Sequence, residues 1–88
     1  MKERHRLAGC TVRIKSGKYK DRLFEIEDWQ ENVMGQSWMN MIGNACALAY
    51  AIRAAEDDLP IDNNVLYGKI GFLGFMIHES EIGEEVVG

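Results

Sequence analysis

The sequence is short of proline, cysteine and long apolar runs, and each shortage excludes a class of protein. One proline among 88 residues, beside nine glycines, excludes a proline-rich or collagen-like chain. No apolar run approaches the roughly 18 residues of a membrane-spanning helix, and no charged-then-apolar leader opens the chain. Hydrophobic residues (47%) and charged residues (27%) occur in ordinary globular proportions. We therefore expect one small soluble domain in the cytoplasm, without a membrane partner.

The two cysteines, Cys10 and Cys46, can form at most one disulfide. Secreted domains of this size usually carry more, so a reducing compartment is favoured and both thiols are predicted to be free and half-buried. The alternatives are a metal site shared with His5 or His78, or a redox couple. Neither has the CxxC or paired Cys/His spacing that such sites use.

The net charge of −4 is divided unevenly along the chain. Residues 1–22 hold eight basic and two acidic residues, a net +6, and residues 23–88 hold two basic and twelve acidic residues, a net −10. Such a division is typical of a basic binding edge beside an acidic body. The alternative is that the two segments fold against each other and neutralise across neighbouring strands.

Alternating apolar and polar residues predict a hairpin in the first third of the chain. Between Cys10 and Lys15, every second residue is apolar, which is the period of a half-buried strand. Residues 16–18 (Ser-Gly-Lys) then indicate a turn in which Gly17 takes positive φ. A returning strand follows, with Phe24 and Ile26 inward, and ends near residues 29–30.

The middle of the chain changes period and predicts a helix over about residues 44–57. Alanine-rich residues 45–55 follow Asn44, a good N-cap, and Pro60 stops the helix. We expect Leu48 and Ile52 to be buried and Arg53 exposed, because one apolar stripe has helical spacing; it consists of Ala45, Leu48, Ala49, Ile52 and Ala55. A weaker strand is predicted at residues 36–41.

Two further strands are predicted at residues 65–70 and 72–79, on either side of Gly71. Gly68, Gly71 and Gly74 in so short a stretch indicate bends or bulges. The ends of the chain are predicted to be a polar arm (residues 1–8) and a frayed acidic tail (residues 83–88). The whole chain is thus expected to form one domain.

Residues 9–22 (GCTVRIKSGKYKDR) resemble a KOW-type motif, the opening hairpin of SH3-like barrels in certain ribosomal and transcription-elongation proteins. The family usually has glycine where this chain has Asp21, and a second glycine where it has Phe24 or Glu25. Residues 75–82 resemble the last strand and short 3₁₀ turn of such a barrel. The resemblance implies a mainly β (α+β) fold, an SH3-like barrel of about five antiparallel strands with one inserted helix. It also implies binding of RNA or DNA.

No pattern points to catalysis, so we expect no catalytic residues, no metal ligands and no cofactor. Gly17-Lys18 lacks the flanking glycine and hydroxyl residue of a phosphate loop. Residues 71–74 have the spacing of a KH clamp but an apolar centre. His78 and Ser80 would share one face of a strand while Glu79 points away, so these three neighbours cannot form a relay.

Three candidate interaction surfaces remain. The first is an acidic face for partner binding, Glu25, Glu27, Asp28 and Glu31. The second is a basic hairpin for nucleic acid, Arg13, Lys15, Lys18, Tyr19, Lys20 and Arg22. The third is an aromatic rim of Trp29 and Trp38. The alternative is that the charged residues are merely solvated and the two tryptophans close the barrel.

These surfaces favour a non-enzymatic binding module. In style the chain is similar to small proteins of bacteriophages and other mobile elements. The first hypothesis is therefore a phage protein, such as an anti-CRISPR-like host-defence inhibitor, in the cytoplasm of a bacterial host. Its acidic face would act as a nucleic-acid mimic and dock on a host protein or protein–nucleic-acid complex. The second hypothesis is a KOW-like domain that binds RNA or DNA directly through residues 13–22.

Overall fold

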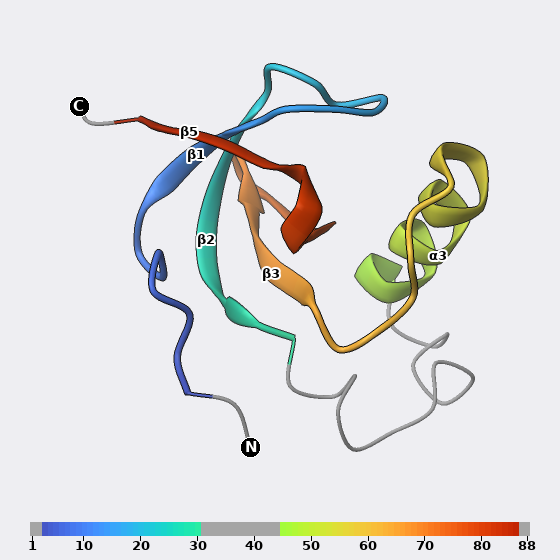
Figure 1. The fold of residues 1–88 in the computed structure, drawn as a ribbon, viewed down its shortest axis with the longest axis horizontal. Helices are drawn as coiled ribbons and strands as arrows, with labels where there is room; N and C mark the ends of the chain where they lie inside the picture. The colour runs from blue at the N-terminus through green and yellow to red at the C-terminus, as the bar shows by residue number, and fades with distance from the viewer. Residues whose placement is uncertain (1–2, 31–44, 87–88) are drawn as a thin grey trace.

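The fold is one antiparallel sheet with a helix against part of it (Figure 1). The computed structural model describes residues 3–30 and 45–86. The elements are β1 (Thr11–Ile14), β2 (Leu23–Trp29), α3 (Ala45–Asp57), β3 (Val65–Ile70), β4 (Leu73–His78), the 3₁₀ turn η1 (Glu79–Glu81) and β5 (Ile82–Val86). The strand order is β4-β3-β2-β1-β5. A mainly β fold with one helix is thus confirmed, but among the described residues β4 and β5 are sheet edges, so the sheet does not close into a barrel.

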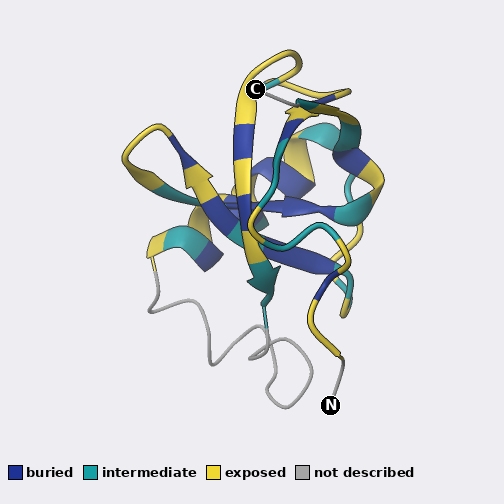
Figure 2. Ribbon diagram, turned by 90° about the vertical axis from the view of Figure 1, so that its left-hand side faces the viewer, coloured by how far each residue is buried: buried dark blue, intermediate teal, exposed yellow. Residues whose placement is uncertain are grey.

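The predicted first hairpin is confirmed. Val12, Ile14 and Phe24 are fully buried and Ile26 nearly so, while the residues between them in β1 and β2 are exposed or half-buried. Figure 2 shows this alternation as bands along the strands. Together with Leu66, Ile70 and Ile77, these four side chains form the main core.

Strands β3 and β4 are buried on both faces where Val65–Leu66 pair with Ile77–His78, whereas Lys69 and Leu73 at the other end are exposed. Leu66 and Ile77, opposite each other in the ladder, face the main core. Val65 and Met76 face α3, where they form a second cluster with Ala47, Tyr50 and Ala54. Gly68 lies opposite Ile26, and a Cβ there would collide with the carbonyl oxygen of Glu25, so β2 and β3 approach closely only because this residue is glycine.

The helix forms where expected, but the prediction of its buried face is wrong. Leu48 is 40% and Ile52 is 53% exposed, whereas Arg53 is only 5% exposed. All three other members of the predicted stripe, Ala45, Ala49 and Ala55, are exposed as well. The buried residues are instead Ala47, Tyr50, Arg53 and Ala54.

Two polar contacts explain the choice of face. The Tyr50 hydroxyl donates to the carbonyl oxygen of Pro60 at 2.7 Å, and Arg53 pairs with the buried carboxylate of Glu81. These partners offset much of the cost of burying the polar groups. The small residues Ala47 and Ala54 let the helix approach β3 and β4. Hydrophobic spacing alone counts Arg53 as a surface residue and therefore selects the wrong stripe.

The ends of the chain are more ordered than the sequence indicates. The frayed acidic tail predicted at residues 83–88 is wrong for residues 83–86, which belong to β5 and pair with β1. In the predicted polar arm, His5 is buried because its main-chain N–H donates to Asp28 at 3.0 Å and its Nε2 lies 3.1 Å from Glu79. The predicted strand at residues 36–41 and the Asn44 cap lie outside the described residues.

Cys10 and Cys46 are half-buried and form no disulfide, as the sequence predicts. Within residues 3–30 and 45–86, no helix is long and apolar enough to cross a membrane. The same described residues contain no cluster of three or more histidine, cysteine or acidic side chains with the geometry of a metal site.

The observed buried face of α3, which differs from the one the sequence predicts, leads to a stability prediction. Leu48→Asp should leave the domain folded, because the new carboxylate meets solvent. Ala47→Asp should lower the free energy of unfolding by at least about 3 kcal/mol, because it buries an unpaired charge against β3 and β4. Thermal and urea unfolding of both variants checks this, and a larger loss for Leu48→Asp would contradict the observed face.

Candidate functional site: the basic loop and helix α3

Residues 15–22, hereafter the basic loop, join β1 to β2 and extend toward the C-terminal end of α3 (Figure 1). The loop is closed at its base by two main-chain hydrogen bonds, from the Asp21 N–H to the Ile14 carbonyl (2.7 Å) and from the Ile14 N–H to the Arg22 carbonyl (2.9 Å). Gly17 has φ +83°, as the turn requires. These bonds make the loop a defined projection from the sheet.

Asp21 also has positive φ, +72°. This is the position where KOW-type motifs usually have glycine, so the sequence departs from the motif while the backbone conformation is the one glycine favours. Aspartate is among the few residues that adopt this conformation at modest cost. Asp21 therefore allows the chain to turn at this position.

The charges of the loop are available to a partner. Five cationic side chains on and beside it are exposed: Arg13, Lys15, Lys18, Lys20 and Arg22. In the part of the chain that the structure describes, no carboxylate lies within ion-pair distance of any of them. Arg13 donates to the Asp21 carbonyl, and the Lys18 ammonium is 6.0 Å from the centroid of the half-buried Tyr19 ring. The structure thus places all six predicted basic-hairpin residues together.

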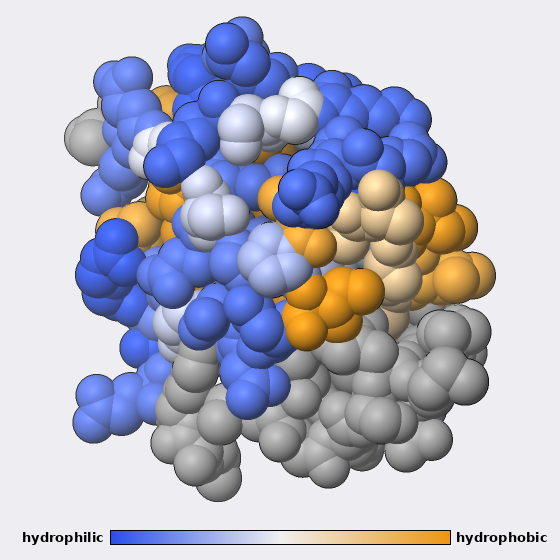
Figure 3. Space-filling model, turned by 45° about the vertical axis from the view of Figure 1, so that its right-hand side comes forward, coloured by the Kyte–Doolittle hydropathy of each residue, from blue (hydrophilic) through white to orange (hydrophobic). Residues whose placement is uncertain are grey.

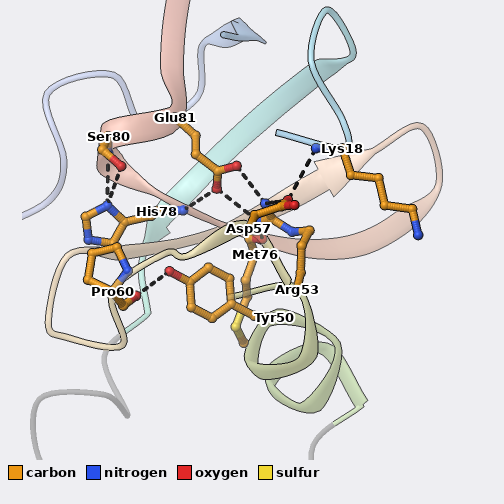
Figure 4. A network of polar contacts seen from close by, with 9 residues as sticks. All are labelled: Lys18, Tyr50, Arg53, Asp57, Pro60, Met76, His78, Ser80 and Glu81. Atoms are coloured by element: carbon orange, nitrogen blue, oxygen red, sulfur yellow. Dashed lines mark hydrogen bonds and ion pairs between the residues drawn. The ribbon is translucent and has the colours of Figure 1, made fainter. Parts of the chain in front are cut away.

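Asp57, in the last turn of α3, contacts the loop tip. Its Oδ2 accepts a hydrogen bond from the Lys18 main-chain N–H at 3.3 Å and lies 4.0 Å from the Arg53 guanidinium. A Cβ on Gly17 would lie only 3.0 Å from the same oxygen, so the close approach of loop and helix favours glycine there. Figure 4 shows the Lys18 ammonium pointing away from this contact.

A buried ion pair lies beneath the loop. Arg53 Nη1 and Nη2 donate to the two carboxylate oxygens of Glu81 at 2.6 and 2.9 Å, and Nη2 also donates to the Met76 carbonyl at 2.9 Å (Figure 4). Glu81 accepts a further hydrogen bond from the His78 main-chain N–H at 3.0 Å. The Arg53 guanidinium carbon is 5.3–5.7 Å from three ring centroids, those of Tyr19, Tyr50 and Phe75. The bidentate pair thereby joins α3, β4 and η1.

His78 has the neighbours of a Ser–His–Asp series, with Asp62 rather than Glu79 as the acid. Its Nδ1 lies 2.8 Å from Ser80 Oγ and its Nε2 lies 2.9 Å from Asp62 Oδ1. The Ser80 main-chain N–H also donates to Nδ1, at 3.1 Å. The lone pair that a catalytic base would use is therefore engaged by the main chain, and His78 acts as the N-cap of η1.

The carboxyl of Asp62 is stabilised in its charged form. Burial raises its pKa, but hydrogen bonds from the Asn64 main-chain N–H and from His78 outweigh that effect and hold the pKa below the ordinary 3.8. Burial likewise raises the pKa of Tyr50, and nearby Glu81 raises it further. Tyr50 therefore stays protonated as the hydrogen-bond donor to Pro60.

The acidic face is smaller than the sequence predicts. Glu25 and Glu27 are exposed on β2, but the Asp28 carboxylate accepts hydrogen bonds from the main-chain N–H groups of His5 (3.0 Å) and Trp29 (2.7 Å). Burial raises the pKa of Asp28, yet these bonds bring it below 3.8. Two cations, Arg4 and Lys69, line the same hollow as Glu25 and Glu27. Glu31 lies outside the described residues.

Of the predicted aromatic rim, the structure describes Trp29, which does not lie beside the loop. Trp29 ends β2, at the opposite end of the strand from the loop, and its ring meets His5 edge-on at 4.7 Å between centroids. Trp38 lies outside the described residues. The aromatic residue of the loop is Tyr19, which contacts Phe75 edge-on at 4.8 Å.

A hollow of about 200 Å³ lies between the loop and the helix, beside their contact at Asp57. Its walls come from the loop, from α3 and from β4: Lys18, Tyr19, Ala49, Ile52, Arg53, Glu56 and Phe75. Figure 3 brings this side of the molecule forward and shows exposed hydrophobic side chains beside hydrophilic ones. Hydrophobic spacing does not predict the hollow, because it places the exposed Ile52 in the core. The signal available was Arg53, a single charge within an otherwise apolar helical run.

The Asp21 conformation predicts the effect of placing glycine at this position. Asp21→Gly should leave the free energy of unfolding within about 1 kcal/mol of the parent, because relief of left-handed strain offsets the added freedom of the unfolded chain. Asp21→Val should lower it by about 1–2 kcal/mol, because a β-branched residue is strained at positive φ. Urea unfolding of both variants measures the difference, and equal stabilities would contradict the assignment.

The buried ion pair predicts a strongly non-additive double-mutant cycle. Arg53→Met and Glu81→Met should each lower the free energy of unfolding by about 3–5 kcal/mol, because each leaves one uncompensated buried charge. The double variant should lose less than the sum of the two, since no charge is then left unpaired. Additive losses would show that the two side chains stabilise the fold independently.

Comparisons of this chain with protein-family models, curated proteins and solved structures found no match.

Proposed function

We propose that this chain is a KOW-like, SH3-like domain that binds nucleic acid directly through its basic loop and catalyses no reaction. The observation that carries the proposal is the projecting loop with four exposed cations and a fifth, Arg13, beside it on β1, none of them ion-paired within the described residues. Exposed lysine and arginine side chains on one projection neutralise successive phosphates and release counterions, which is the main source of affinity for nucleic acids.

The fold supports this proposal in two ways. Strands β1 to β4 neighbour one another in chain order and β5 returns beside β1, after the 3₁₀ turn that precedes the last strand of an SH3-like barrel. The positive φ of Asp21 supports a KOW-type turn at the site of the proposed contacts. The acidic residues in the rest of the chain repel a bound nucleic acid only at short range, because salt screens exposed charges beyond about 8 Å at physiological ionic strength.

A second candidate is the host-docking inhibitor carried by a phage or mobile element, acting as an anti-CRISPR-like nucleic-acid mimic. The observation that favours it is the exposure of Glu25 and Glu27 on one face of β2. Its partner would be a basic groove on a host protein or protein–nucleic-acid complex. Engagement of Asp28 within the fold and the neighbouring cations Arg4 and Lys69 make this acidic surface weaker than the basic loop.

Charge reversal separates the two candidates. The variant Lys15→Glu/Lys18→Glu/Lys20→Glu should lose at least about tenfold in affinity for labelled single-stranded RNA and DNA, because three phosphate contacts become repulsive. The matched control is Lys69→Glu, which reverses an exposed lysine outside the loop and should change affinity much less. Fluorescence anisotropy at several salt concentrations gives both values, with a log–log salt slope of up to about 3.5 for five contacts on a single strand.

Charge reversal at Glu25 and Glu27 tests whether the acidic face, rather than the basic loop, is the binding site. Glu25→Lys/Glu27→Lys should leave nucleic-acid binding unchanged or slightly tighter if the loop is the site. Failure of the parent protein to bind any of these probes, or an unchanged affinity in the lysine variant, would overturn the nucleic-acid proposal. Capture of a basic host protein by the parent but not by the Glu25/Glu27 variant would then favour the second candidate.

A further inference from the structure

We infer that the hollow between the basic loop and α3 receives one unpaired nucleobase, so that the ligand is a single strand. This inference rests on the proposed function and names the ligand class of the same site. The hollow, at about 200 Å³, has a largely apolar wall formed by Tyr19, Ala49, Ile52 and Phe75. A planar base fits such a wall, because stacking and apolar contact do not depend on its identity.

Three charged side chains line the hollow, and two of them, Lys18 and Glu56, lie on opposite elements and match the two ends of a nucleotide. Lys18, on the loop, continues the series of cations at positions 13, 15, 20 and 22 and would contact the phosphate. Glu56, on the exposed face of α3, offers a carboxylate that can accept a hydrogen bond from an exocyclic amino group. A duplex keeps its bases inside the stack, so only an unpaired or extruded base reaches this wall.

The Glu56 carboxylate argues against an acidic peptide as the ligand in the hollow. An acidic segment drawn to the loop cations would bring its own carboxylates toward Glu56 and its neighbour Asp57, and like charges at close range repel. Arg53 does not offset this repulsion, because the residue is buried and its guanidinium donates hydrogen bonds to Glu81 and to the Met76 carbonyl. A nucleotide carries its negative charge on the phosphate alone. Its phosphate can therefore contact Lys18 while its base contacts Glu56.

Hydrogen bonding by Glu56 also predicts a base preference. Cytosine carries an exocyclic amino donor where thymine carries a carbonyl acceptor, and glutamate commonly accepts a hydrogen bond from that amino group. The two bases are similar in size, so the apolar wall does not distinguish them. We therefore expect oligo(dC) to bind more tightly than oligo(dT) of equal length.

The test fills the hollow without changing charge. Ala49→Leu places a larger side chain on an exposed helix position that lines the hollow, and Ala55→Leu makes the same change at an exposed position of α3 outside it. Ala49→Leu should lower the affinity for oligo(dC) about tenfold, the loss of one base contact, and leave a duplex of equal length unaffected. Ala55→Leu should change neither, and thermal unfolding verifies that both variants fold.

A second variant separates hydrogen bonding from general electrostatics. Glu56→Met removes the carboxylate acceptor together with its charge. If only electrostatics acts, this variant binds all anionic ligands more tightly by the same factor, whereas the inference expects the preference for oligo(dC) over oligo(dT) to fall at least about threefold. Loss of binding in the triple lysine variant with unchanged binding in Ala49→Leu would overturn the base site while leaving the proposed function standing. Equal affinity of the parent for single strand and duplex would also overturn it. A parent that binds neither would overturn both proposals.

Discussion

The buried ion pair between Arg53 and Glu81 is the contact on which the rest of the arrangement depends. Charged groups leave water at a cost of several kcal/mol each, and that cost is recovered only when geometry is good and the remaining hydrogen-bonding groups are satisfied. Here both carboxylate oxygens, the two terminal nitrogens of the guanidinium, a β4 carbonyl and the His78 amide converge, and within the described residues only Arg53 Nε is a buried side-chain polar atom left without a hydrogen-bond partner. The pair therefore fixes which face of α3 meets the sheet, and so which face meets solvent.

The orientation of α3 determines the character of the candidate site. With Arg53 turned inward, Ala49, Ile52 and Glu56 turn toward the basic loop and form one wall of the hollow. Asp57 follows one helical turn after Arg53 and meets the loop through the Lys18 main chain. The buried contact between Arg53 and Glu81 thus places the apolar wall of α3 and the Glu56 carboxylate opposite the cations of the basic loop.

The sequence predicts the local structure well and the helix orientation poorly, and the reason is physical. Alternation of period two identifies β1 and β2, because their inner faces are wholly apolar: Val12, Ile14, Phe24 and Ile26. The helix carries two stripes with helical spacing, and the buried one contains Arg53, whose partner Glu81 lies 28 residues away. Pairing across that separation leaves no periodic signal. The basic loop was predictable because its residues are contiguous, whereas the hollow draws on three elements.

The conformation of the basic loop depends on main-chain hydrogen bonds and not on the lysine side chains that would contact a ligand. Lys18 is held through its amide, and the loop base through the amides of Asp21 and Ile14, so the lysine side chains contribute nothing to these contacts. Residues at positions 15, 18 and 20 are therefore free to change with little effect on folding. Related chains could diverge in the ligand they recognise by exchanging these side chains, provided that Gly17 and the carboxylate at position 57 are retained.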